Sequence, residues 1–174
     1  MRKKLVFCAM GVALSMVTSY IKLWDMPMGG SITLMSMFFV SLIGYWYGLR
    51  WGVMTAVTYG VLQLILDPYV ISLPQLVLDY ILAFGALGLS GFFKGRKNGL
   101  YTGYIVSVLG RFIFTFLSGV IFFGMYAADY GMSETVYSIL YNGGYIFPEM
   151  VLTLVVISLK PVRNVLERVK TMAN

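Results

Sequence analysis

The 174-residue sequence contains no histidine and a single cysteine, Cys8. Without histidine the chain lacks the commonest metal ligand and the side chain that most often carries protons near neutral pH. A lone cysteine excludes a disulfide within the chain. The sequence also lacks a Ser/His/Asp or Cys/His set, a phosphate-binding glycine loop and a dinucleotide fingerprint. We therefore expect no enzyme, no metal site and no cofactor.

Charge is also scarce, because only 11% of the residues are charged whereas 59% are hydrophobic. The mean hydropathy is +0.83. A soluble domain of this size does not have enough interior for so much apolar sequence. The sequence therefore predicts an all-α integral membrane protein, and its net charge of +6 reports orientation in the bilayer rather than nucleic-acid binding.

Apolar runs separated by proline and charged residues predict six transmembrane helices, which form one membrane domain. The third run is short for a full span and the last two are long, which indicates tilt or partial spanning. We expect the first helix to be retained rather than cleaved as a signal peptide, because no small-x-small site follows it. The predicted helices cover residues 5–23, 32–49, 51–66, 73–93, 99–126 and 134–159, and a basic cytoplasmic tail covers residues 160–174.

Basic residues gather at both ends of the chain and in every second connection between the predicted helices. By the positive-inside rule, this pattern places both termini in the cytoplasm. The tail after Pro161 can form a short basic helix on the membrane surface. The basic groups are Arg2, Lys3 and Lys4; Arg50; Lys94, Arg96 and Lys97; and Lys160, Arg163, Arg168 and Lys170, whereas the alternate loops hold Lys22, Asp25, Asp67, Asp129 and Glu134.

The fourth apolar run, residues 73–93, carries one carboxylate, Asp79, in its middle. An aspartate at that depth costs at least about 2.5 kcal/mol on insertion scales, so it normally faces a partner, a cavity or a ligand. Tyr80 lies beside it and Gln75 lies one turn earlier. The sequence therefore predicts a polar site at the level of Asp79.

Polar and aromatic side chains recur at helical spacing on the fifth and sixth runs. We interpret Arg111 and Glu149 as a structural ion pair, because each charge at membrane depth needs a partner. The tyrosines are interpreted as a ligand site, since aromatic faces with a carboxylate and an amide suit a flat, cationic, hydrogen-bonding ligand. The two helix faces are Arg111, Thr115, Ser118 and Phe122, and Tyr137, Tyr141, Tyr145 and Glu149.

Four sequence blocks, in order, resemble the thiamine-specific substrate-binding subunits of energy-coupling-factor vitamin transporters. The resemblance covers about residues 5 to 159, and the L-D-Y and Y-S-x-x-Y-N blocks are its most specific part. The blocks are PMGGSITL at residues 27–34, LDY, LAF, LGL and GFF within residues 78–93, RF and SGVIF within residues 111–122, and YSILYNG at residues 137–143.

The resemblance implies a subunit of the bacterial plasma membrane that binds thiamine in an outward-facing pocket. It implies docking through Ala9 and Ala13 of the first helix to a transmembrane coupling subunit that carries two ATP-binding subunits. To the pocket positions that the family supplies, we add Tyr141 for its aromatic face and Gly30 because glycine lets a backbone approach a ligand closely. The positions that match the family's pocket are Asp79, Tyr80, Tyr69, Tyr137 and Asn142.

Two expected pocket positions depart from the family. Thr115 stands where the family often has a histidine, and Phe123 stands where it often has a tryptophan, so we expect weaker ring stacking. One alternative is therefore a subunit for a related precursor such as hydroxymethyl pyrimidine. Another is an autonomous ion-coupled carrier in which Asp79, Arg111 and Glu149 relay protons. A third is a membrane scaffold without a ligand.

Overall fold

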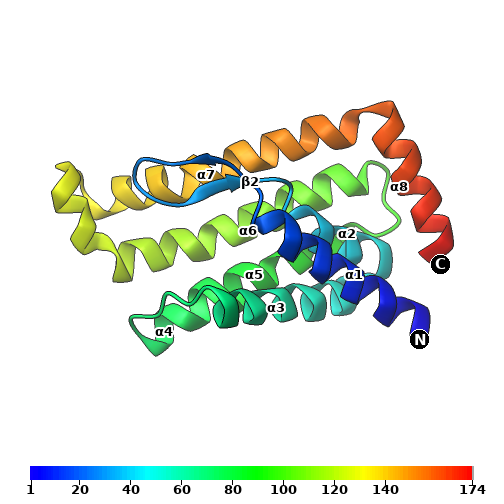
Figure 1. The fold of residues 1–174 in the computed structure, drawn as a ribbon, viewed down its shortest axis with the longest axis horizontal. Coiled ribbons are helices and arrows are strands. Elements are labelled where there is room, and N and C mark those ends of the chain that lie inside the picture. The colour runs from blue at the N-terminus through cyan, green and yellow to red at the C-terminus, as the bar shows by residue number, and fades with distance from the viewer. Residues whose placement is uncertain (174) are drawn as a thin grey trace.

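The computed structural model describes residues 1–173 as an elongated bundle of helices with a short hairpin at one side (Figure 1). The predicted helical class is confirmed. The long helices α3, α6 and α7 run along the main axis of the bundle (Figure 1). The helices are α1 (Arg2–Ser19), α2 (Phe38–Tyr47), α3 (Leu49–Leu66), α4 (Leu73–Leu76), η1 (Val77–Leu82), α5 (Ala83–Gly85), η2 (Ala86–Phe93), α6 (Gly99–Phe122), η3 (Gly124–Tyr130), α7 (Glu134–Ser158) and α8 (Lys160–Ala173).

Within the described residues, four helical segments are long and apolar enough to cross a membrane. They are α3, the continuous segment of residues 73–93, α6 and α7. The helix α1 has 18 residues, but its first turn carries three basic side chains. The helix α2 has only 10 residues, which at about 1.5 Å per residue is half of the hydrocarbon core.

The connection between α1 and α2 differs from the prediction. We expected helices over residues 5–23 and 32–49, whereas the chain forms an antiparallel hairpin of β1 (Lys22–Asp25) and β2 (Ser31–Thr33). Gly29 and Gly30 have positive φ angles, which glycine adopts without steric cost. The start of α2 is delayed to Phe38 because hydrogen bonds to Glu149 hold the preceding segment in a non-helical form.

The predicted segment at residues 73–93 is helical throughout, but it is not a uniform α-helix. Ser72 caps its start by accepting a hydrogen bond from the backbone N–H of Gln75. A π-helical turn, η1, then covers Asp79 and Tyr80, and a 3-10 segment, η2, completes the span. Helices of the π type are rare and often lie at functional sites. No sequence pattern indicated this π-helical turn.

Small residues allow α2, α3 and η2 to approach closely in the half of the bundle away from the hairpin. A Cβ atom added to Gly52 would lie 2.6 Å from the Cα of Gly44, and one added to Gly88 would overlap the backbone of Val53. Such close helix packing is typical of membrane proteins, in which small residues replace the hydrophobic driving force. The core next to this contact is aromatic, with Phe38 packed edge-on against Tyr104.

Both ends of the described chain lie at the same end of the bundle (Figure 1). The helix α8 turns back there and packs onto the bundle, where the Tyr47 hydroxyl donates a 2.9 Å hydrogen bond to the carbonyl of Ala173. The tail is therefore helical, as predicted, and residue 174 lies outside the described residues. The helix α6 ends at Phe122 and not at residue 126, because the chain continues as the 3-10 helix η3.

Candidate functional site

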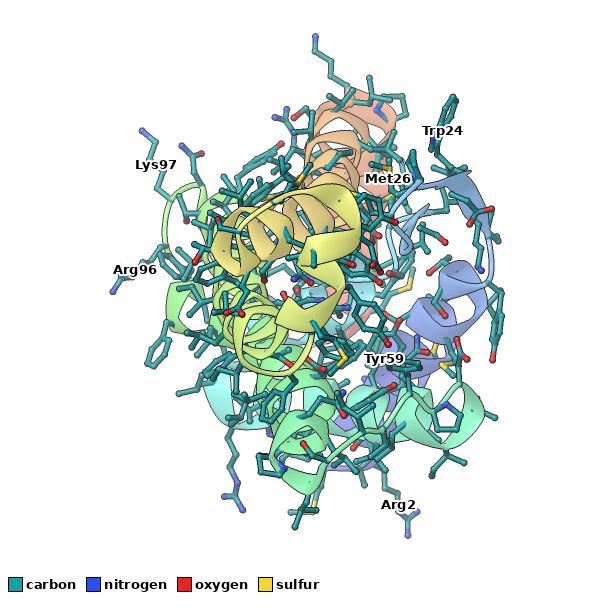
Figure 2. The ribbon with its side chains drawn as sticks, turned by 90° about the vertical axis from the view of Figure 1, so that its left-hand side faces the viewer. Arg2, Trp24, Met26, Tyr59, Arg96 and Lys97 are labelled. Carbon is teal, nitrogen blue, oxygen red and sulfur yellow. The ribbon has the colours of Figure 1, made fainter. Side chains whose placement is uncertain are left out.

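A cavity of about 660 Å³ opens at the end of the bundle opposite the termini, where α4, η1, η3 and the first turns of α7 meet. Small-molecule sites commonly measure about 300–1,000 Å³. We call it the aromatic cavity, because its walls carry seven tyrosines and two phenylalanines. Figure 2 views the bundle from this end. The aromatic residues are Tyr69, Tyr80, Phe84, Phe123, Tyr126, Tyr130, Tyr137, Tyr141 and Tyr145.

Asp79 enters the aromatic cavity from the π-helical turn η1. One of its carboxylate oxygens accepts a 2.6 Å hydrogen bond from the Nε2 amide of Gln75. The other carboxylate oxygen has no hydrogen bond to residues 1–173 and lines the cavity. A carboxylate in this position can accept hydrogen bonds from an amino group or pair with a cation.

Gln75 fixes both Asp79 and the loop that precedes it. Its side chain is 1% exposed. The same amide that bonds Asp79 also donates to the carbonyl of Tyr69 at 3.1 Å, and Oε1 accepts from the backbone N–H of Ile71 at 3.2 Å. A fully satisfied buried amide of this kind rigidifies its surroundings.

Tyr80 and Tyr69 form one wall of the aromatic cavity. The Tyr80 hydroxyl accepts a 2.9 Å hydrogen bond from the backbone N–H of Tyr69 and donates to the carbonyl of Asp67 at 3.2 Å. The Tyr69 ring stacks on Phe123 with 5.8 Å between centroids. Its hydroxyl lies 3.2 Å from that of Tyr126, and this hydrogen bond raises the pKa of Tyr69 above its ordinary value. The Tyr69 phenol is therefore neutral at physiological pH.

The helix α7 supplies the opposite wall. Tyr137 and Tyr141 are stacked with 5.9 Å between centroids, and Tyr145 meets Tyr141 edge-on. Asn142 donates through Nδ2 to the carbonyl of Thr115 on α6 at 3.2 Å, and its Oδ1 accepts from the Tyr145 hydroxyl at 3.2 Å. The asparagine thus joins the two helices and orients a cavity tyrosine.

Arg111 also lines the aromatic cavity, and the predicted ion pair between Arg111 and Glu149 is wrong. The Arg111 guanidinium lies 4.1 Å from the centroid of the Phe84 ring. Glu149 is 3% exposed and instead accepts hydrogen bonds from the segment that precedes α2, at Thr33, Ser36 and Met37. The pairing was mistaken because the sequence does not show that the non-helical segment before α2 supplies donors to Glu149.

The structure brings eight of the nine residues expected to bind substrate to the same cavity. The exception is Gly30, which lies outside the lining and packs against the ring of Tyr145. Whether any of these residues contacts a ligand stays a prediction. Ala9 and Ala13 lie on an exposed face of α1, away from the cavity. The eight are Asp79, Tyr80, Tyr69, Thr115, Phe123, Tyr137, Asn142 and Tyr141.

The sequence analysis missed several residues of the lining. Gln63 is a polar side chain within the apolar run of α3, and that contrast could have been noticed. It donates a 2.8 Å hydrogen bond to the Tyr59 hydroxyl. Met28 reaches the cavity from the hairpin, which no local pattern indicates. Phe84 looks like ordinary apolar sequence and gives no signal at all.

The geometry combines one free carboxylate oxygen, several aromatic faces and a mostly apolar surrounding. These features are suited to a flat organic solute that carries a positive charge and hydrogen-bond donors. Three carboxylates line the cavity, those of Asp67, Asp79 and Asp129, against the single cation of Arg111. The fold and this cavity define the class of a helical membrane protein with a site suited to a small organic solute.

Comparisons with known proteins give the family. The family model described as thiamine transporter protein matches residues 5–167. The thiamine transporter ThiT of Bacillus subtilis strain 168 is 33% identical over 149 residues, which are 78% of this chain and 77% of that protein. The chain belongs to the thiamine transporter family, a family of multi-pass bacterial membrane proteins, and the resemblance seen in the sequence is confirmed.

Two further relatives agree with this assignment. The thiamine transporter ThiT of Lacticaseibacillus paracasei is 30% identical over 126 residues, which are 64% of this chain and 60% of that protein. A solved structure of ThiT from Listeria monocytogenes superposes with a TM-score of 0.74 at 25% identity, and the match covers 91% of this chain and 94% of that one. The fold is therefore shared over nearly the whole length.

Proposed function

We propose that this chain is the thiamine-binding subunit of an ATP-driven uptake transporter of the energy-coupling-factor type. The observation that carries the proposal is the aromatic cavity, in which Asp79 presents a free carboxylate oxygen among tyrosine rings. Thiamine has a permanently charged thiazolium ring and an aminopyrimidine ring. The carboxylate is suited to the amino group or the cation, and tyrosine faces are suited to both rings.

We further propose that the aromatic cavity faces outward and that both termini lie in the cytoplasm, with six spans. The ends of the chain and the basic connections lie at one end of the bundle, and the cavity lies at the other (Figure 1). Basic residues accumulate on the cytoplasmic side of membrane proteins. In this topology α2 crosses the membrane together with the non-helical segment before it, whose backbone N–H groups bond Glu149 inside the protein.

The energy for import would come from partner subunits. The sequence carries no phosphate-binding loop, so the proposed transporter needs separate ATP-binding subunits. Ala9 and Ala13 lie on the exposed face of α1, next to Leu5 and Met10. Small residues one turn apart let a second helix approach closely in a bilayer, which supports docking of a coupling subunit on this face.

One competing ligand deserves a direct test. Thr115 uses its hydroxyl to bond the backbone of its own helix, at the carbonyls of Arg111 and Phe112, and therefore offers less to a ligand ring than a histidine would. Phe123 contributes a smaller stacking face than tryptophan. A smaller pyrimidine, such as hydroxymethyl pyrimidine, is thus the second candidate.

The ion-coupled carrier is less favoured, because Glu149 is held by several hydrogen bonds to the segment before α2.

The test is isothermal titration of the detergent-purified protein with thiamine, hydroxymethyl pyrimidine and riboflavin. We expect saturable binding of thiamine, and we expect Asp79→Asn to weaken it about 10- to 150-fold, because a hydrogen bond to a charged group contributes about 1.5–3 kcal/mol. Asp25→Asn is the matched control, since Asp25 is exposed on the hairpin and does not line the cavity. Binding of hydroxymethyl pyrimidine in preference to thiamine would show that the ligand is the pyrimidine and not thiamine. Equal affinity of the Asp79→Asn variant and the control would remove Asp79 from the site.

A further inference from the structure

A second cavity, of about 370 Å³, lies at the end of the bundle that holds both termini, between α2, α8 and the start of α6. We call it the terminal pocket. Its polar wall carries Arg163, Lys170, Glu167, Tyr45 and Asn98, and its apolar wall carries Trp46 and three leucines. The function proposed above does not use this pocket.

The surroundings of the terminal pocket are strongly basic. Eleven of the thirteen basic side chains of the sequence lie at this end of the bundle, and Lys22 and Arg111 are the two exceptions. Within residues 1–173, the only carboxylate side chain at this end is that of Glu167, which is exposed on α8. Glu167 lines the terminal pocket together with Arg163 and Lys170, so one carboxylate faces two cations and the pocket keeps a net positive charge that attracts an anion.

One cation of the terminal pocket, Lys170, is held in place by the fold. The Lys170 ammonium lies 4.7 Å from the centroid of the Tyr45 ring and donates a 3.4 Å hydrogen bond to the Tyr45 hydroxyl. The hydrogen bond from Tyr47 to Ala173 secures the end of α8 against α2. The side chains of Arg163 and Asn98 are exposed and make no hydrogen bond to residues 1–173, so their donors are free for a ligand.

We propose that the terminal pocket binds the phosphate group of an anionic phospholipid headgroup. A phosphate can accept two hydrogen bonds from the Arg163 guanidinium and one from the Lys170 ammonium. The N-terminus of the long helix α6, directly after Asn98, adds a partial positive charge at the same place. Basic pockets between helices on the cytoplasmic side are a known setting for anionic headgroups.

The apolar wall favours a lipid over a free phosphate ion. Trp46 is 5% exposed and lies among leucine side chains, so it offers a surface for the glycerol and the first methylene groups of a lipid. The proposed topology also places this end of the bundle at the level of the cytoplasmic headgroups. The inference depends on that topology and is independent of which solute occupies the aromatic cavity.

The experiment is native mass spectrometry of the full-length protein in detergent, titrated with dioleoyl phosphatidylglycerol. Dioleoyl phosphatidylcholine and inorganic phosphate serve as comparison ligands. The double variant Arg163→Gln/Lys170→Gln is compared with Lys160→Gln/Arg168→Gln, which removes the same charge from exposed positions of α8 outside the pocket. We expect the pocket variant to lose about tenfold in affinity for phosphatidylglycerol and the control to lose less than about twofold.

Several outcomes would overturn the proposal. An equal loss in both double variants would show general attraction of a basic helix rather than a site. If phosphatidylcholine bound as tightly as phosphatidylglycerol, the pocket would not require a net negative charge on the lipid. If inorganic phosphate displaced phosphatidylglycerol at an equal concentration, the pocket would be a site for a free anion and not for a lipid. Should the double variant fail to fold, Arg163→Gln alone carries the test, because Arg163 is exposed. Thiamine titration of the same variants separates the two proposals, since we expect it to be unchanged.

Discussion

The hydroxyl of Thr33 donates a 2.5 Å hydrogen bond to a carboxylate oxygen of Glu149, although the two residues are 116 positions apart. The same carboxylate accepts from the Ser36 hydroxyl at 3.0 Å and from the Met37 backbone N–H at 3.1 Å. A buried charge is tolerated when it is satisfied by several donors in this way. Glu149 therefore attaches the end of the hairpin to α7, about one helical turn after Tyr145, which lines the aromatic cavity.

This attachment predicts an effect of Glu149→Gln on ligand release. The glutamine side chain carries no charge, and its NH₂ group cannot accept hydrogen bonds from the donors that surround it. The segment before α2 should therefore detach from α7 more often. We expect a loss of about 1.5–3 kcal/mol of stability in that attachment. Hydrogen exchange of residues 22–37 should accelerate, and thiamine should dissociate faster. Unchanged exchange in this segment would contradict the attachment, and Glu167→Gln on α8 is the exposed control.

Gln75 offers a second test, because its amide bonds the Asp79 carboxylate at 2.6 Å. Gln75→Leu keeps the volume and removes the hydrogen bond, and we expect thiamine binding to weaken about tenfold. Gln75→Glu should be worse, because it places a second carboxylate against Asp79. Isothermal titration calorimetry with thiamine gives the affinity of each variant and so ranks the two. If the glutamate variant binds as well as the leucine variant, Asp79 is not ionised when the ligand binds.

The two positions that depart from the family can be restored. Phe123 stacks on Tyr69 at the cavity wall, so Phe123→Trp enlarges an existing aromatic surface. We expect tighter thiamine binding by about 0.5–1.5 kcal/mol, the usual contribution of an aromatic pair. Thr115→His adds a second ring at the cavity. Titration calorimetry with thiamine gives both values, and no gain in either variant would show that the ligand does not reach these walls.

Gly119 predicts a packing defect at the contact between α6 and α7. A Cβ atom at this position would overlap the Ser138 hydroxyl and lie 3.0 Å from the Nδ2 atom of Asn142. Gly119→Ala should therefore push the helices apart and break the hydrogen bond from Asn142 to Thr115. We expect about 1–3 kcal/mol of destabilisation, measured by thermal unfolding in detergent. Gly143→Ala on α7 is the comparison variant, because a Cβ atom there would meet only side-chain atoms, the nearest 3.3 Å away on Phe147.

Most of the helices and eight of the twenty residues that line the cavity were predictable from the sequence, because apolar run length and helical spacing are local properties. Asp79, Tyr137 and Asn142 stand out as polar or aromatic positions within apolar runs, and all three line the aromatic cavity. The partner of Glu149 was not predictable, since it depends on a backbone segment that is distant in sequence. The hairpin was missed for a related reason. Its glycines were seen as a turn, but the strands beside them are only four and three residues long.

The π-helical turn at Val77–Leu82 has a consequence for how the chain can vary. A π-turn places one additional residue in a helical turn, so the parts before and after it are out of phase by about 100°. Gln75 and Asp79 can therefore be aimed into the aromatic cavity while Phe84 keeps its own contact with Tyr59 on α3. Deleting a single residue within this turn would restore a regular α-helix and rotate the residues before the turn relative to the residues after it. A point substitution in this turn changes one side chain. A one-residue deletion would instead change the orientation of Gln75 and Asp79 relative to Phe84, so the cavity contacts and the contact with Tyr59 could not both form.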